Sequence, residues 1–161
     1  FLLNAQQETL NTNLEEVILD VFQMNWQSIK IKVYSNDRTD IVLDNIANAL
    51  NLPTQFIPYF CLYIIKREDN NCIPIRRLQN FESPYLTLKS LDSVRNNLNV
   101  VIRKKYWDSI YDDDLLDNRA ALNILYSQTL YDVERNILQT TKEIRRQLTG
   151  LQAKGSKKEV F

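Results

Sequence analysis

The residues that could do chemistry in this chain gather in one short stretch, residues 100–122. Its basic run, Arg103 to Lys105, is followed at once by an aromatic pair, Tyr106 and Trp107. Three consecutive aspartates come next: Asp112, Asp113 and Asp114. Carboxylates at this density could ligate a cation, bind a partner, or face the free amides at the start of a helix.

The aspartates are predicted to be helix-start acids, because an alanine- and leucine-rich helical pattern follows them. The first amides of a helix lack partners within it, and negative charge is favoured beside them. A metal cage is disfavoured, since three adjacent carboxylates point in different directions. A partner-binding acidic site is the remaining alternative.

Tyr106 and Trp107 separate a strand-like pattern from a helical one. Large aromatic rings bury much apolar area, and the polar atoms of tyrosine and tryptophan find partners at boundaries between packed units. We therefore predict that both rings form an inter-lobe hinge, wedged between the two halves of the chain.

Composition excludes several kinds of function. The 161 residues include no histidine and only two glycines, Gly150 and Gly155, which excludes histidine-based catalysis, histidine metal ligation and a glycine-rich phosphate loop. Twenty basic residues balance twenty acidic ones, which argues against a nucleic-acid-binding surface. We therefore predict no catalytic residues, no cofactor and no metal site. An enzyme of ubiquitin-like modification is disfavoured too, because no cysteine lies in a reactive context.

Cys61 and Cys72 both lie in apolar stretches. We predict buried, reduced thiols of a cytosolic protein, and a disulfide between neighbouring strands is the less favoured alternative. No apolar run reaches the length of a membrane-spanning helix, and no signal peptide is recognisable. The chain starts with Phe1, and we interpret it as a piece of a longer protein.

Alternation of apolar and polar residues predicts strands with one buried face at residues 15–23 and 28–34. A helical period follows over residues 35–53, with Thr39 as the expected N-cap and Pro53 as the stop. Its apolar stripe is expected to comprise Val42, Leu43, Ile46, Ala49 and Leu50.

The next part of the sequence predicts a largely buried strand at 59–67, a proline-containing edge strand at 72–79 and a last strand at 97–105. In the last strand, Leu98, Val100 and Ile102 are expected to face the core, and residues 81–90 are expected to be irregular. The order of strand, strand, helix and three strands predicts an α+β fold. One helix would pack across a mixed sheet in the ubiquitin-like β-grasp arrangement.

From Asp112 onward the period is helical, which predicts a small, incomplete all-α lobe. One face of its first helix is expected to hold Ala121, Leu122, Leu125, Thr129 and Val133. Thr140 and Glu143 form a capping-box pattern that predicts a second helix, and residues 156–159 repeat this pattern. Residues 1–9 are expected to be a short helix end.

Several stretches resemble one known family, the endosomal sorting nexins that carry a FERM-like module. The sequence RKKYWDSIYDDDLLDNRAALNILYSQTLYDVER (103–135) resembles the junction between the first and second FERM lobes. RRLQNFESPY (76–85) is similar to the first lobe, FLLNAQQET (1–9) to the end of a phox-homology domain, and residues 141–159 to the continued second lobe. The chain departs from the pattern at Asn25, where a turn glycine is missing, and at Gly155.

This resemblance implies three parts: the end of a phox-homology domain with its linker (1–13), a ubiquitin-like first FERM lobe (14–105) and an incomplete helical second lobe (106–161). It implies a non-enzymatic adaptor, peripheral on early endosome membranes on the cytoplasmic side, that serves receptor sorting and recycling. Phosphatidylinositol 3-phosphate and Asn-Pro-x-Tyr cargo tails would bind to parts outside this chain.

Lys30, Lys32 and Arg38 form a candidate GTPase-binding edge. If the fold is ubiquitin-like, residues 28–34 are an edge strand, and Ras-association domains of this fold add that strand to the sheet of a small GTPase. The resemblance supports this alternative, because the family's first lobe is Ras-association-like. The competing interpretation is that these lysines only discourage other strands from docking.

A further basic group, Arg76 and Arg77 with Arg103 to Lys105, could form a phosphoinositide patch. Solvated surface charge is the favoured interpretation.

Overall fold

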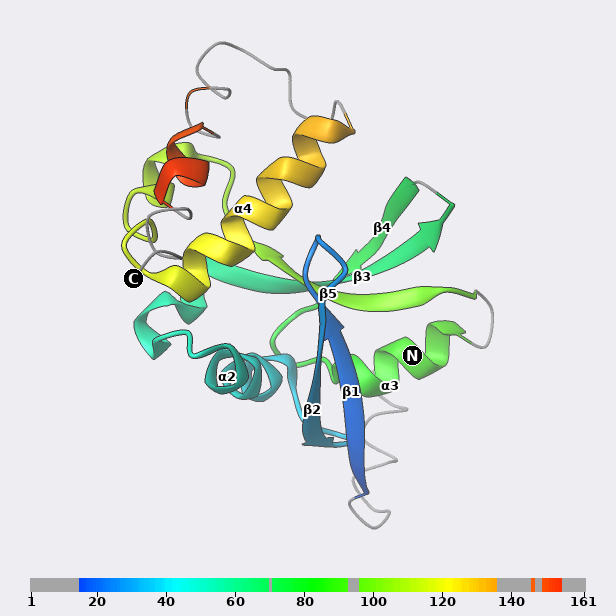
Figure 1. Cartoon of the computed structure of the whole chain (residues 1–161). Coiled ribbons are helices and arrows are strands. Elements are labelled where there is room, and N and C mark those ends of the chain that lie inside the picture. Colours follow the sequence, from blue (N-terminus) through cyan, green and yellow to red (C-terminus); the bar gives the residue numbers. More distant parts are fainter. Residues whose placement is uncertain (1–14, 70, 93–95, 136–145, 147–148, 155–161) are drawn as a thin grey trace.

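The computed structural model describes residues 15–69, 71–92, 96–135, 146 and 149–154 (Figure 1). The elements follow in the order β1 (Glu16–Phe22), β2 (Ser28–Tyr34), α2 (Thr39–Leu50), η1 (Thr54–Tyr59), β3 (Phe60–Glu68), β4 (Asn71–Arg77), α3 (Pro84–Asp92), β5 (Leu98–Lys104), η2 (Ser109–Asp112) and α4 (Arg119–Glu134). The elements η1 and η2 are 3₁₀ helices. The predictions for residues 1–9, for Thr140 and Glu143 and for 156–159 lie outside the described residues.

The five strands form one mixed sheet in the order β2-β1-β5-β3-β4. The central pair, β1 and β5, is parallel, whereas the β1–β2, β3–β4 and β3–β5 pairs are antiparallel. This is the predicted ubiquitin-like arrangement, and the α+β fold is confirmed. As predicted, β2 and β4 lie at the two edges of the sheet.

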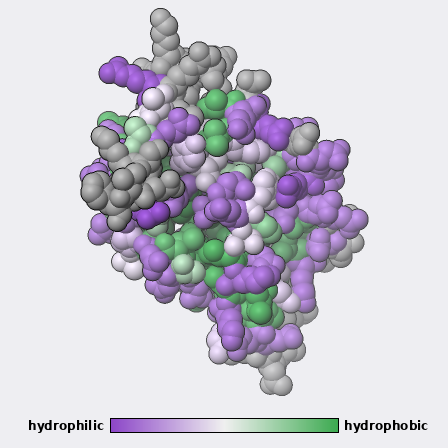
Figure 2. Space-filling view, in the orientation of Figure 1, coloured by the Kyte–Doolittle hydropathy of each residue, from purple (hydrophilic) through white to green (hydrophobic). Residues whose placement is uncertain are grey.

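The period-two pattern places the apolar side chains of the β1–β2 hairpin on one face. Leu19, Val21, Ile31 and Val33 are buried, whereas Ile18, which points to the other face, is 62% exposed. Figure 2 shows this mixed surface: hydrophilic side chains cover most of the visible face, and apolar ones gather over the area where Figure 1 places α2 and the hairpin.

The helix α2 packs on the buried face of the sheet through Val42, Leu43, Ile46 and Ala47. The expected stripe was wrong at one position, because Ala49 is exposed and Ala47 takes its place. The helix ends at Leu50, and Asn51 adopts a left-handed conformation with a φ of 55°. Pro53 follows two residues later, as expected of a helix stop.

Thr39 is not the N-cap of α2; it is the first helical residue, and Arg38 precedes it without a side-chain capping bond. The backbone amide and the hydroxyl of Thr39 both donate to the carbonyl oxygen of Glu82, at 2.8 and 2.9 Å. A residue distant in sequence therefore satisfies the first amide of the helix, a role that capping side chains usually fill.

Residues 81–90 were expected to be irregular, but Pro84–Asp92 form the helix α3. The Ser83 hydroxyl accepts a bond from the amide of Leu86 at 3.3 Å and donates to the carbonyl of Ser35 at 2.7 Å. Serine before a proline at the first helical position is a recognised start signal. The weak apolar periodicity of the segment hid this signal.

The strand β5 lies in the middle of the sheet and is buried on both faces. Leu98, Val100 and Ile102 face the main core as predicted, but Val101 is fully buried too, in a second cluster with Ile65 and Tyr131. Tyr131 belongs to α4, which lies across β5 (Figure 1). Helix α4 therefore covers part of the sheet face opposite to α2.

The buried face of α4 differs from the predicted one. Ile124, Leu125, Gln128, Tyr131 and Asp132 are buried, whereas the expected residues Thr129 and Val133 are only half-buried. Polar residues lie on the buried face because the helix packs against the strand ends, where backbone and charged groups need partners. Within the described residues, no helix is long and apolar enough to cross a membrane.

Candidate functional site

The junction between β5 and α4 is organised by Tyr106. Its half-buried ring places the hydroxyl 2.7 Å from Asp112 Oδ1, to which it donates a hydrogen bond. The Lys104 ammonium lies 3.6 Å from the same oxygen and 5.2 Å from the centre of the Tyr106 ring. Burial and the bond to Asp112 both raise the pKa of Tyr106, so the phenol stays protonated and keeps donating.

Tyr106 belongs to a row of four aromatic rings in contact. Ring centres lie 6.5 Å apart for Phe56 and Tyr59, 5.9 Å for Tyr59 and Tyr106, and 5.5 Å for Tyr106 and Tyr111. The last two pairs meet edge to face, the favoured geometry for aromatic contacts. The rings thus connect η1, the end of β5 and η2 into one packed joint.

The prediction that the three aspartates mark a helix start is wrong. Asp112 ends the short η2, Asp113 follows it, and α4 begins only at Arg119. The N-cap of α4 is Asn118, whose Oδ1 accepts from the Ala121 amide at 3.0 Å. The Asn118 side chain therefore caps the free amide of Ala121 in the first turn of α4, and the aspartates are not needed for this capping.

Two of the aspartates pair with tyrosine hydroxyls instead. Asp112 accepts from Tyr106, and Asp114 Oδ2 accepts from Tyr59 at 3.0 Å. This bond is the largest cause of the raised pKa of Tyr59. No group of acids, cysteines or histidines among the described residues has the geometry to hold a metal ion.

Trp107 corrects the hinge prediction. Its side chain is 89% exposed, so it does not wedge between the two halves. The Lys105 amide donates to the Tyr59 carbonyl at 2.8 Å, and the chain bends at Lys105, just past β5. Beyond this bend the Tyr106 ring packs on Tyr59 and its hydroxyl donates to Asp112, whereas Trp107 lies in solvent.

Two polar contacts fasten α4 to the end of β5. The Lys104 amide donates to Gln128 Oε1 at 2.8 Å, and Arg103 Nη2 lies 3.1 Å from Asp132 Oδ1. Burial raises the pKa of the Asp132 carboxyl, and the positive charge of Arg103 opposes that rise. The sequence analysis did not identify Gln128 and Asp132. The only sequence signal for them is that they lie four residues apart, so that both fall on the buried face of α4.

The candidate GTPase-binding residues all have acidic neighbours. Lys30 Nζ lies 2.9 Å from Asp20 and Lys32 Nζ lies 3.7 Å from Glu16. Both pairs join β1 to β2. Lys30 lies directly opposite Asp20 in the strand register, whereas Glu16 is two residues away from Ile18, the residue opposite Lys32. Arg38, at the start of α2, pairs with Asp40 at 2.6 Å. These residues are exposed, but their charges are partly balanced within the lobe.

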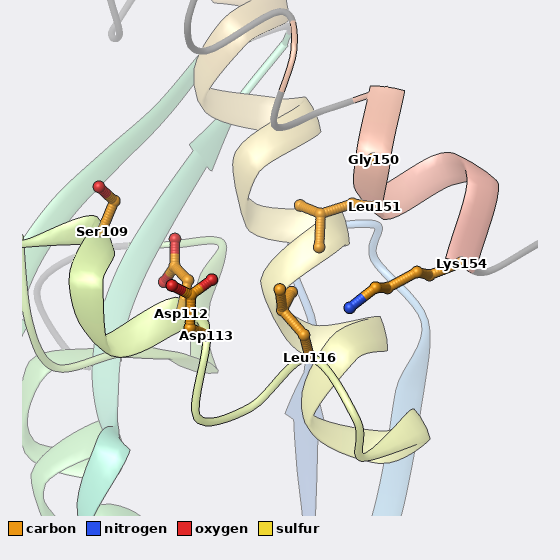
Figure 3. Close-up of a pocket in the computed structure, with 7 residues that line it drawn as sticks. All are labelled: Ser109, Asp112, Asp113, Leu116, Gly150, Leu151 and Lys154. Carbon is orange, nitrogen blue, oxygen red and sulfur yellow. The ribbon is translucent and has the colours of Figure 1, made fainter.

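A small cavity of about 160 Å³ lies beside η2. Figure 3 shows Asp112 and Asp113 on one side and Lys154 extending from the facing helical segment, with Leu116 and Leu151 between them. Leu151 is buried at this cavity. A neighbouring acid pair and a lysine around apolar side chains are typical of a packing seam, and no nucleophile and base meet there.

The two cysteines are free thiols. Cys61 is buried as predicted, whereas Cys72 is only half-buried. Burial raises the pKa of the Cys61 thiol despite the nearby cations Arg77, Arg103 and Lys105. A thiol that stays protonated is a poor nucleophile, so Cys61 is a structural residue.

Ion pairs neutralise three of the five basic residues that were considered as a phosphoinositide patch. Arg76 contacts the buried carboxylate of Glu82, Arg103 pairs with Asp132, and Lys104 pairs with Asp112. Arg77 and Lys105 remain, and neither forms an ion pair with another described residue.

The β-grasp sheet joined to a helical segment defines a FERM-type module. A family model of the sorting nexin 17/27/31 FERM domain, F1 lobe, matches residues 17–107, and a model of the sorting nexin 17/31 FERM domain, F2 lobe, matches residues 108–161. The chain belongs to this family of sorting nexin FERM domains.

Individual relatives agree with this assignment. The chain is 43% identical to sorting nexin-17 of Danio rerio, with 99% of the chain and 33% of the relative aligned. It is 45% identical to sorting nexin-17 of Homo sapiens, over 99% of the chain and 34% of the relative. The chain therefore spans about a third of the length of these relatives.

Among solved structures, the chain is similar to the MyTH4-FERM MF2 domain of Dictyostelium discoideum myosin VII. The TM-score is 0.57 at 14% identity, and the match covers 91% of this chain and 35% of that one. At this identity the likeness concerns the fold alone.

Proposed function

We propose that this chain is a non-enzymatic adaptor segment of an endosomal sorting nexin. It holds a lipid-binding module and a cargo-binding module in fixed relation, for receptor sorting and recycling. The observation that carries this proposal is the continuous packing across the lobe junction. Leu115, Ile124 and Leu125 share one apolar core with the sheet, and Tyr106 links the end of β5 to η2. A segment that fixes the relative position of two modules needs such a stiff joint.

In this proposal residues 1–13 end a phox-homology domain, 14–105 form the first FERM lobe and 106–161 begin the second. Phosphatidylinositol 3-phosphate and Asn-Pro-x-Tyr tails bind outside the chain, and the protein is cytoplasmic and peripheral on early endosomes. The sorting nexin relatives support this assignment, since the chain spans about a third of their length. No cofactor or nucleic acid is part of the proposed activity.

The test compares the 161-residue chain with the longer protein that carries it. We expect only the longer protein to bind vesicles containing phosphatidylinositol 3-phosphate and a labelled Asn-Pro-x-Tyr peptide. The double variant Arg103→Ala/Gln128→Ala, which loosens α4 from β5, should keep both separate affinities but weaken peptide capture on vesicles. Binding of either ligand by the isolated chain, or unchanged capture by the variant, would contradict the proposal.

A second candidate function is that of a Ras-association module. The edge position of β2 favours it, because an edge strand can extend the sheet of a GTP-loaded small GTPase. The ion pairs of Lys30 and Lys32 with β1 acids weigh against it, since they supply a purely structural role for both lysines. Titration calorimetry with a GTP-analogue-loaded Ras-type protein tests it. Lys30→Glu/Lys32→Glu should abolish binding, and equal binding by this variant would reject the idea.

A further inference from the structure

The corner of the sheet where β4 and β5 end carries two adjoining hollows. One, of about 220 Å³, lies between the sheet and α4, beside Tyr63, Pro74 and Trp107. The other, of about 200 Å³, lies toward α2, beside Leu43 and Phe81. Arg77 and Lys105 line both hollows, so the two cations stand on the ridge between them.

The charges on this ridge are not neutralised within the described part of the chain. Arg103, in the first hollow, is matched by Asp132, and Lys104 is matched by Asp112. Arg77 and Lys105 are exposed and form no ion pair with any described residue. The ridge therefore presents two free positive charges within otherwise paired surroundings.

Large aromatic side chains flank this charge on both sides. Trp107 is 89% exposed beside the first hollow, and Phe81 is 52% exposed beside the second. Exposed aromatic residues next to arginine are the residue types that dominate binding energy in protein interfaces. Contact with solvent is enough to explain why a lysine and an arginine are exposed here. It does not explain why two large aromatic rings are exposed at the same corner.

We propose that this corner, formed by Arg77, Lys105, Trp107 and Phe81, binds an acidic peptide segment of a partner protein. Carboxylates of the peptide meet the Arg77 guanidinium and the Lys105 ammonium. Apolar side chains on either side of the acids enter the two hollows against Trp107 and Phe81. The surface lies within this chain, whereas the lipid and cargo sites of the proposed adaptor lie outside it.

The surroundings favour a peptide over an anionic membrane. A flat, negatively charged bilayer would have to approach Asp108 and the three aspartates Asp112 to Asp114 together with the ridge, whereas a short acidic peptide can contact Arg77 and Lys105 alone. Two separate hollows beside a narrow ridge also suit alternating side chains of an extended peptide better than a flat lipid surface.

Fluorescence anisotropy with the 161-residue chain tests the proposal. The probe is a fluorescein-labelled peptide, Gly-Ser-Leu-Asp-Glu-Asp-Phe-Ser-Gly. One control peptide has lysine at the three acidic positions, and a second has alanine in place of leucine and phenylalanine. We expect the acidic probe to bind, the lysine peptide not to bind, and the alanine peptide to bind about tenfold more weakly. Binding should weaken as salt is raised.

The key variant is Arg77→Glu/Lys105→Glu, which should weaken binding of the acidic probe by about tenfold or more. Lys30→Glu/Lys32→Glu makes the same charge change at the opposite edge of the sheet and should leave the affinity within about twofold. Both pairs are exposed, so circular dichroism should show an unchanged fold. Trp107→Ala should lower affinity for the probe but not for the alanine peptide.

Three results would overturn the proposal. The first is no binding of the acidic probe at up to about 1 mM peptide. The second is equal binding by Arg77→Glu/Lys105→Glu and the unchanged chain. The third is binding of phosphatidylserine vesicles that needs Arg77 and Lys105 while the peptide does not compete, because the corner would then be a membrane contact. None of these results bears on the lipid and cargo sites of the longer protein.

Discussion

The Tyr106 hydroxyl donates to Asp112 Oδ1 across 2.7 Å, and this bond joins the first aromatic residue after β5 to the end of η2. The two partners are six positions apart in sequence. The intervening segment holds the exposed Trp107 and leads to Ser109, where η2 begins. The hydrogen bond therefore closes a short loop between the last strand of the sheet and η2. It fixes the position at which the helical part of the chain begins.

Removing that bond should loosen the joint. Tyr106→Phe keeps the ring but removes a donor to a carboxylate that is mostly buried, so we expect a loss of about 1–2 kcal/mol in unfolding free energy. Urea denaturation followed by circular dichroism measures it. The matched control is Tyr111→Phe, an exposed tyrosine whose ring also packs on Tyr106, which should change stability by less than about 0.5 kcal/mol. Equal effects of the two variants would show that the Tyr106 hydroxyl is not the joint.

Trp107→Ala should leave stability within about 0.5 kcal/mol, because the ring contributes little buried area. A wedged tryptophan would cost about 3–5 kcal/mol instead. Denaturant unfolding separates these two outcomes. In a Trp26→Phe background, the remaining tryptophan fluorescence should also be quenched readily by acrylamide. A protected, blue-shifted emission would place the Trp107 ring inside the joint after all.

Asn118→Ala should destabilise the chain by about 1 kcal/mol, since it removes the acceptor for the Ala121 amide at the start of α4. Asp113→Ala is the paired control and should change stability by less than about 0.5 kcal/mol, because Asp113 is exposed and precedes the helix. Thermal and urea unfolding give both values. A larger loss for Asp113→Ala than for Asn118→Ala would restore the aspartates as the helix-start acids.

Alkaline pH should weaken the contact between α4 and the sheet through Tyr131. Burial, together with a hydrogen bond involving Cys72, raises the pKa of Tyr131 from 10.0 to about 12. The folded chain therefore holds this proton more tightly than the unfolded chain, so the stabilisation is complete below pH 10.0 and is lost as the pH approaches about 12. Urea unfolding across this range should show stability falling with pH, and Tyr131→Phe should reduce the slope. An unchanged slope in Tyr131→Phe would mean that Tyr131 does not titrate in this way.

The fold was largely predictable because its signals are local. Alternation placed β1 and β2 on Glu16–Phe22 and Ser28–Tyr34, close to the expected ranges, and the proline in β4 indicated an edge strand. Helix α3 was missed because its apolar periodicity is weak, although the Ser83-Pro84 start signal was present. Missing this helix also hid the role of the neighbouring Glu82, whose carbonyl oxygen accepts hydrogen bonds from Thr39 at the start of α2.

The candidate site was predictable only in outline. The sequence placed the aromatic pair at a boundary, but it could not say which ring turns inward. That choice depends on partners from other elements, since the Tyr106 ring packs on Tyr59 and its hydroxyl donates to Asp112. The aspartates were wrongly predicted to mark a helix start, because their tyrosine partners come from other parts of the chain. Tyr59 lies 55 residues away from Asp114.

The sequence by itself determined the five strands, the helices α2 and α4, the edge strands, the absence of histidine chemistry and the family resemblance, because periodicity, composition and motif are properties of neighbouring residues. Only the tertiary structure decided which charges are free. Arg76, Arg103 and Lys104 look like Arg77 and Lys105 in sequence, but the first three meet carboxylates of Glu82, Asp132 and Asp112 when the chain folds. Charge pairing depends on distances of a few ångströms between side chains, and those distances are set only when the chain has folded.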